Sequence, residues 1–220
     1  PLGWDQIGEK PVIKRLTREE FVDYKNKFYT SENTVISVAG DITEKEAEEW
    51  VTTYFPFQNA KRAHQYLPYK KEEKGGRVVL QHKKTDQAHL ILGVEGVPAL
   101  HPEDTTEKVL SAILGGNMSS RMFMNIREAK GLCYYIRTNT DDYADTGVFS
   151  TAAGIDVNRI DLAITAILEQ YKRIAEGGVT AAELKKAKEF MKGKIILKLE
   201  DSEEYAHLMG KQALLYPDVE

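Results

Sequence analysis

The chain has 220 residues, of which 42% are apolar and 29% are charged. This composition is typical of a soluble globular protein with one large or two small domains, and it excludes a disordered chain. The net charge of −4 offers no positive field for nucleic acid, and no apolar run reaches the roughly 20 residues that span a bilayer. We therefore expect neither a nucleic-acid partner nor a membrane partner.

The first part of the chain predicts two helices around a strand. Thr17 precedes Glu20 by three positions, and Thr43 precedes Glu46 in the same way. This spacing is typical of a capping box, in which each side chain binds the backbone amide of the other residue. The β-branched run between the two pairs indicates a strand. The predicted elements are helices at 18–28 and 44–54 and a strand at 34–39.

Residues 58–76 differ in character from the segments on either side. They are polar, they end in Gly75 and Gly76, and they lack periodic apolar positions. These features predict a linker between 1–57 and 77–220.

After the linker, predicted strands come in adjacent pairs that alternate with pairs of helices. The order ββ-αα-ββ-αα predicts an α+β fold, with a mostly antiparallel sheet and helices packed on one face. The expected strands are 77–82, 88–93, 132–138 and 147–153, and the expected helices are 102–114, 119–128, one from Asp156 to Gly177, and 181–199 behind a third Thr/Glu pair at Thr180 and Glu183.

Residue types and spacings give no complete active site. None of the five histidines belongs to a motif in which two His residues flank a Glu at zinc-binding spacing, so we expect no metal site. The single cysteine, Cys133, lies in a predicted strand without an activating base nearby, so we expect a buried thiol rather than a nucleophile. One cysteine excludes an internal disulfide and favours the cytoplasm, although a signal peptide could lie upstream.

One stretch of the chain resembles a known family. It reads Leu-Gly-Gly-Asn-Met-Ser-Ser-Arg from Leu114 to Arg121, and Arg-Glu-x-x-Gly-Leu-x-Tyr from Arg127 to Tyr134. Together with 16–41 upstream and 145–149 downstream, it is similar to the insulinase/pitrilysin zinc metallopeptidases, which include insulysin and the mitochondrial processing peptidase. The resemblance covers about 1–57 and 77–216.

The resemblance implies a place for this chain in a larger protein. In this family two similar α+β domains face each other like the halves of a clamshell. Zinc is held by His-x-x-Glu-His and a later Glu, early in the first domain. Residues 1–57 would be the C-terminal part of that catalytic-type domain, and 77–220 would be the second, non-metal domain without its C-terminal part. All zinc ligands of the parent protein would then lie upstream of Pro1, and this chain would hold no catalytic residue.

The resemblance assigns substrate binding to Arg127 and Tyr134. The family's Arg/Tyr pair reaches from the non-metal half to an unfolded peptide substrate, which binds as an added strand. Arg presents a fork of donors to a peptide carbonyl, and a Tyr hydroxyl can donate to a developing oxyanion. From the residues alone, the alternative is a salt-bridged Arg127 and a Tyr134 in the core. Tyr135 would point to the opposite face of the strand and lie in the core.

Two functions remain open from the sequence. The first is a segment of a zinc metalloendopeptidase, inactive alone, that works with a zinc-bearing domain or subunit. The alternative is a non-catalytic subunit or a structural relative of the same fold that acts as an interaction protein. The presence or absence of His-x-x-Glu-His in the parent protein would separate the two.

Residues 1–57 also offer the helix, strand and helix that 77–220 would lack. We therefore expect 1–57 to dock at the end of the second domain, either within one chain or by segment exchange in a homodimer.

Overall fold

The structure, a computed structural model, describes residues 4–56, 66–71 and 78–215. The chain divides into two units, one made of Pro1–Leu67 with Leu197–Glu220 and the other of Pro68–Ile196. The second unit contains the sheet, and we refer to it as the sheet unit. The first unit, which we call the helical unit, contains no strand among its described residues.

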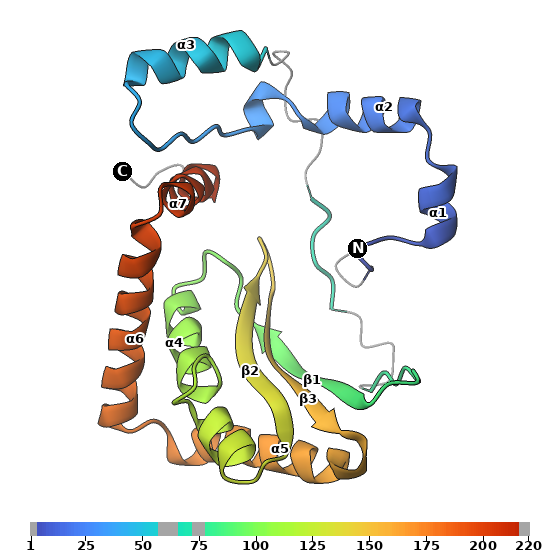
Figure 1. Cartoon of the computed structure of the whole chain (residues 1–220), viewed down its shortest axis with the longest axis vertical. Helices are drawn as coiled ribbons and strands as arrows, with labels where there is room; N and C mark the ends of the chain where they lie inside the picture. Colours follow the sequence, from blue (N-terminus) through green and yellow to red (C-terminus); the bar gives the residue numbers. More distant parts are fainter. Residues whose placement is uncertain (1–3, 57–65, 72–77, 216–220) are drawn as a thin grey trace. The chain divides into compact units, whose positions relative to one another are not determined.

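Three antiparallel strands form the sheet: β1 (Gln87–Gly96), β2 (Cys133–Asp142) and β3 (Gly147–Asp156). β3 lies in the centre and pairs with β2 on one side and β1 on the other. Figure 1 shows β2 and β3 as a long twisted hairpin. The predicted α+β fold with an antiparallel sheet is confirmed, and the strands extend beyond the ranges that the sequence predicts.

Helices cover one face of this sheet. They are α4 (Asp104–Leu114), the short π-helix η2 (Phe123–Glu128) and α5 (Ile160–Gly177), which follows the 3-10 turn η3 (Val157–Arg159). The next helix, α6 (Ala181–Leu199), packs through Ala187 against α4. Side chains alternate along β3, so that Ala153 and Ile155 are buried in one core with Leu114, Ile126 and Ile167 from the helices. Burial of this apolar face stabilises the unit. The opposite, open face of the sheet carries His89 and Arg137, both exposed.

The helical unit contains α1 (Lys10–Arg15), α2 (Arg18–Phe28), the 3-10 turn η1 (Ser31–Asn33), α3 (Glu44–Tyr54) and α7 (Ser202–Leu215). The predicted capping boxes are present. Thr17 Oγ1 accepts a hydrogen bond from the Glu20 amide at 3.3 Å, while Glu20 Oε2 accepts one from the Thr17 amide at 2.8 Å. Thr43 and Glu46 repeat the arrangement at 3.3 and 2.9 Å. The two predicted helices are therefore confirmed at their N-termini.

Two predicted strands are wrong. Thr34 has extended backbone angles, but residues 34–39 pair with no strand in the described part of the chain. Ser37 instead lies close to α7, where a Cβ added to Gly210 would come within 3.2 Å of the Ser37 Cβ. Residues 78–82 also form no strand, and Arg77 lies outside the described residues. A strand needs the backbone of a partner, and neither segment finds one among the residues that the structure describes.

The unpaired 34–39 segment contradicts docking of 1–57 into the sheet within one chain. Segment exchange between two chains stays a prediction. So do the boundaries 1–57, 58–76 and 77–220, because residues 57–65 and 72–77 lie outside the described residues.

From Pro68 onward, the described part of the predicted linker belongs to the sheet unit, and two bonds tie it to the rest of that unit. The Tyr69 amide donates to Asp145 Oδ2 at 2.6 Å, and Lys71 forms an ion pair with Glu95. Within the described ranges, no helix has both the length and the apolar character needed to cross a membrane.

Candidate functional site

Arg127 lies in the last turn of η2. This segment is π-helical, since the Ala129 amide donates to the Met124 carbonyl five residues earlier at 3.0 Å. The Arg127 guanidinium carbon stands 4.6 Å from the centroid of the Phe123 ring, which is a cation–π contact. Among the described residues no carboxylate forms the ion pair with Arg127 that the salt-bridge alternative requires. Short π-helical segments occur frequently at functional sites.

A tight, well-braced turn connects η2 to β2. Gly131 has φ of +55°, a left-handed angle that favours glycine. The Gly131 amide donates to the Arg127 carbonyl at 3.0 Å, and the Leu132 amide donates to the Ile126 carbonyl at 3.1 Å. These two bonds close the helix end. The Arg159 guanidinium then holds the outside of the turn by donating to the Gly131 carbonyl at 2.9 Å.

Tyr134 is the extra residue of a β-bulge at the start of β2. Cys133 pairs with Ile155 and Tyr135 pairs with the next residue of β3, Gly154, so Tyr134 has no partner in the ladder. Its side chain is 57% exposed. The alternative that places Tyr134 in the core is therefore wrong. Bulges are over-represented next to active sites, where they redirect a side chain.

The same bulge overturns the prediction that Tyr135 lies in the core. An extra residue breaks the inside–outside alternation of a strand, so Tyr135 no longer falls on the buried face. Its ring lies over Gly154, and its hydroxyl is 3.0 Å from Nδ1 of His89 on β1. Both partners are on the open face of the sheet.

The positive charge of Arg127 acts on Cys133, the first residue of β2. Burial raises the pKa of the Cys133 thiol, and the positive charge of Arg127 partly opposes this shift. The thiol therefore stays protonated at neutral pH and behaves as a small buried group, as the sequence predicts. Arg127 and Tyr134, seven positions apart, thus flank one braced turn, but no direct contact joins their side chains in the described structure.

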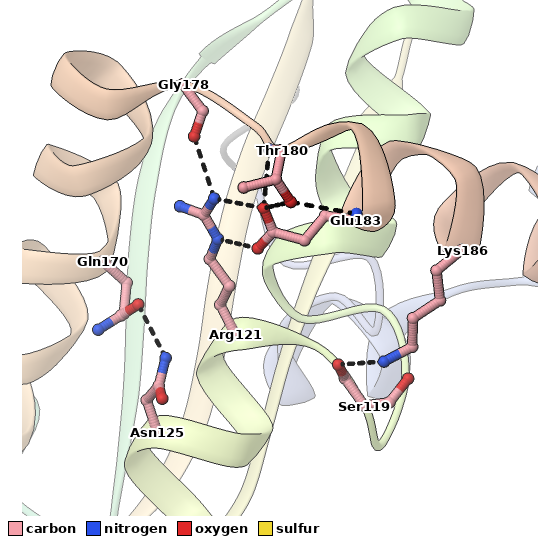
Figure 2. Close-up of polar contacts among 8 residues, drawn as sticks. All are labelled: Ser119, Arg121, Asn125, Gln170, Gly178, Thr180, Glu183 and Lys186. Atoms are coloured by element: carbon pink, nitrogen blue, oxygen red, sulfur yellow. Dashed lines mark hydrogen bonds and ion pairs between the residues drawn. The ribbon is translucent and has the colours of Figure 1, made fainter.

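The Ser-Ser-Arg part of the signature has a different role, which the sequence does not reveal. Figure 2 shows Arg121 pointing at the start of α6, where its Nε and Nη2 donate to the two carboxylate oxygens of Glu183 at 2.6 and 2.8 Å. Nη2 also donates to the Gly178 carbonyl at 3.0 Å. Glu183 is at the same time the capping-box partner of Thr180. The pair therefore fixes α6 to the helical residues that lead into η2.

Arg121 changes the acidity of its partner. Its hydrogen bonds lower the pKa of the Glu183 carboxyl to about 2, against a smaller opposing effect of burial, and the bonds from Thr180 add to the lowering. An open cavity of about 180 Å³ lies beside the pair. It is lined by the ends of α4 and α6 and by the Ser-Ser-Arg loop.

No metal site can be built from the residues that the structure describes. Within them, no three His, Cys, Asp or Glu side chains come together in a way that could hold a metal ion. His89 meets Tyr135 rather than a second histidine.

Comparison with known proteins gives the family. The model of a protein family described as "Peptidase M16 inactive domain" matches residues 15–191. An uncharacterized zinc protease of Bacillus subtilis is 33% identical over 217 residues, which is 97% of this chain and 52% of that protein. The chain thus spans about half the length of the curated relatives that it matches.

Solved structures agree with this result. A protease from Helicobacter pylori superposes with a TM-score of 0.85 at 25% identity, covering 96% of this chain and 52% of that one. A peptidase M16 inactive domain from Pseudomonas fluorescens has the same fold, with a TM-score of 0.79 at 19% identity over 96% of this chain and 50% of that one. The chain belongs to the M16 peptidase family and contains its inactive domain.

Proposed function

We propose that this chain is the non-metal half of a zinc-dependent metalloendopeptidase that acts on unfolded peptides. It would bind substrate and would work with a zinc-bearing domain or subunit, and we call the complete protein the assembled peptidase. Membership of the M16 inactive-domain family supports this proposal, as does the zinc protease name of the Bacillus subtilis relative. The half of the relatives that this chain does not span would be the metal-bearing half.

The observation that carries the proposal is the pair of backbone irregularities around Arg127 and Tyr134. A π-helix holds the first residue and a β-bulge holds the second, with four hydrogen bonds closing or bracing the turn between them. An ordinary α-helix followed by a regular strand would contain neither the π-helix nor the bulge. Each one leaves a polar side chain available at the same end of the sheet, which is what a substrate-binding pair requires.

The chemistry of the two side chains fits binding of a peptide at its reacting carbonyl. The guanidinium of Arg127 can donate to a backbone carbonyl of the peptide and fix its position. The hydroxyl of Tyr134 can donate to the oxygen that becomes negative as the peptide bond is attacked. Zinc, when held by the other half, would polarise the same carbonyl and activate water.

Kinetics of the assembled peptidase test these roles. Tyr134→Phe removes only the hydroxyl, so we expect kcat/KM for an unfolded peptide to fall. The fall should correspond to a loss of about 2–4 kcal/mol of transition-state stabilisation. Arg127→Ala should lower kcat/KM as well. Zinc content and the far-UV circular dichroism spectrum should not change in either variant. Arg173→Ala is a matched control, because Arg173 is an exposed arginine on α5 that pairs with Glu169 four residues away.

The outcomes separate this proposal from its alternative. Full activity of Tyr134→Phe would reduce Tyr134 to a surface residue. An assembled protein that holds no zinc and hydrolyses no peptide would instead indicate a non-catalytic interaction protein of the same fold.

A further inference from the structure

A single row of residues crosses the open face of the sheet next to the bulge. His89 of β1 and Tyr135 of β2 both pair with Gly154, which lies between them on β3. Their side chains reach across the central strand and meet above it, with 3.0 Å between His89 Nδ1 and the Tyr135 hydroxyl. Either atom can supply the proton, depending on the tautomer of the imidazole. The contact therefore joins the two edge strands of the sheet over the middle one.

Gly154 is what permits this contact. A Cβ added at this position would lie 2.5 Å from Cε1 and 2.8 Å from Cδ1 of Tyr135, well inside van der Waals distance. Any other residue would push the ring away from the sheet. Arg137, two positions further along β2, adds a third contact, with its guanidinium carbon 5.8 Å from the centroid of the Tyr135 ring. The ring is thus held beneath, at one side and at its hydroxyl.

The neighbour of Tyr135 in the chain has no comparable support. Tyr134 is unpaired in the ladder and largely exposed, so hydrogen bonding to β3 cannot fix its orientation. Its backbone is fixed on one side by the braced turn at Gly131 and on the other by Tyr135. The direction in which the Tyr134 hydroxyl points depends on both supports.

We infer that His89, Gly154 and Tyr135 are positioning residues that hold the bulge so that Tyr134 faces the substrate. This inference rests on the proposed function of Tyr134. The three residues do not touch the peptide in this account. They act through the backbone at Tyr134, so their removal should change the rate of the chemical step rather than substrate affinity.

A double-mutant cycle in the assembled peptidase tests the inference. Tyr135→Phe and His89→Ala each remove the bond between the edge strands, and each should lower kcat by about threefold to tenfold with KM unchanged. In a Tyr134→Phe background the same changes should have no further effect, because the group that they position is absent. His89→Asn should recover part of the loss, since its amide places a polar atom near the location of Nδ1. Ile91→Ala is the control, as Ile91 is the next open-face residue of β1 and is 71% exposed.

A ¹⁹F NMR measurement tests the inference independently of enzymatic activity. With 3-fluorotyrosine at position 134, the ¹⁹F resonance should shift or broaden on Tyr135→Phe, His89→Ala and Gly154→Ala, and should not move on Ile91→Ala. Failure of Tyr134→Phe to lower kcat/KM would contradict the proposed function, while the ¹⁹F signal would still report whether the row positions Tyr134. An unchanged ¹⁹F resonance in all three variants, or losses that add fully to that of Tyr134→Phe, would overturn the inference.

Discussion

The sheet unit and the helical unit share the same local signal for starting helices, but they differ in how much apolar surface they bury. Both contain Thr/Glu capping boxes that start helices where the sequence predicts them. In the described chain, every buried apolar residue lies between Ala112 and Ala187, in the sheet unit. Trp50 and Tyr54 of α3, by contrast, are exposed. A capping box fixes where a helix begins, but a core forms only where distant segments pair.

The largest expected effect comes from comparing one apolar residue in each unit. Ile155→Ala empties a fully buried site in the core, so we expect the free energy of unfolding to fall by about 3–4 kcal/mol. Trp50→Ala removes a larger side chain that is 57% exposed, and we expect a loss below about 1 kcal/mol. Urea unfolding followed by circular dichroism measures both. Equal losses would mean that α3 has a core of its own.

A smaller effect is expected from the ion pair that fixes α6. Arg121→Ala leaves Glu183 without its two strong hydrogen bonds, so we expect a loss of about 2–3 kcal/mol in the free energy of unfolding. Arg173→Ala breaks an exposed pair four residues apart on α5 and should cost less than about 0.5 kcal/mol. If the two variants were equally stable, the Arg121 pair would be only a surface contact.

The same pair predicts a dependence on pH. The pKa of Glu183 is held at about 2 in the folded chain, below its ordinary value of 4.5. Because the folded value is the lower one, the stabilisation is complete above pH 4.5 and is lost as the pH falls towards 2. The Glu183 side chain is 30% exposed, so after allowance for solvent screening we expect a change of about 1–2 kcal/mol.

Urea midpoints between about pH 6 and about pH 2.5 measure this change. In Arg121→Ala the urea midpoint should fall less steeply as the pH is lowered, which we call a flatter acid limb, whereas Arg173→Ala should keep the acid limb of the parent chain. An acid limb that keeps its full slope in Arg121→Ala would assign the pH dependence to other carboxylates.

The smallest effect distinguishes the units through one motif. Thr180→Ala and Thr43→Ala remove the same capping hydrogen bond, at 3.2 and 3.3 Å. Thr180 starts α6, whose Ala187 is part of a core cluster, so global stability should fall by about 1 kcal/mol. Thr43 starts an exposed helix, so we expect faster amide exchange in α3 with little change in global unfolding. Equal global losses would contradict the division into units.

The sequence predicts well what is decided locally. Each capping box uses residues three positions apart, and the sequence predicts strands at 88–93, 132–138 and 147–153, within or close to β1, β2 and β3. Residues 34–39 have the same β-branched character, yet they form no strand among the described residues, because pairing depends on a partner that the local sequence does not specify.

The candidate site was predicted only in part. The resemblance assigns substrate binding to Arg127 and Tyr134, which stays a prediction, whereas strand alternation puts Tyr135 in the core because alternation cannot reveal a bulge. The Arg121–Glu183 pair joins residues 62 positions apart, and no spacing rule detects it. The glycine at 154 gives a weak signal, since a glycine inside a strand often marks a bulge or a close approach.

We propose that this chain is the half of the peptidase without the metal. The most direct test is to measure zinc per chain after dialysis, and hydrolysis of an unfolded peptide, for this chain alone and for the assembled peptidase. We expect stoichiometric zinc and chelator-sensitive hydrolysis only in the assembled peptidase. Stoichiometric zinc on this chain alone, or hydrolysis by it that a chelator blocks, would contradict the account.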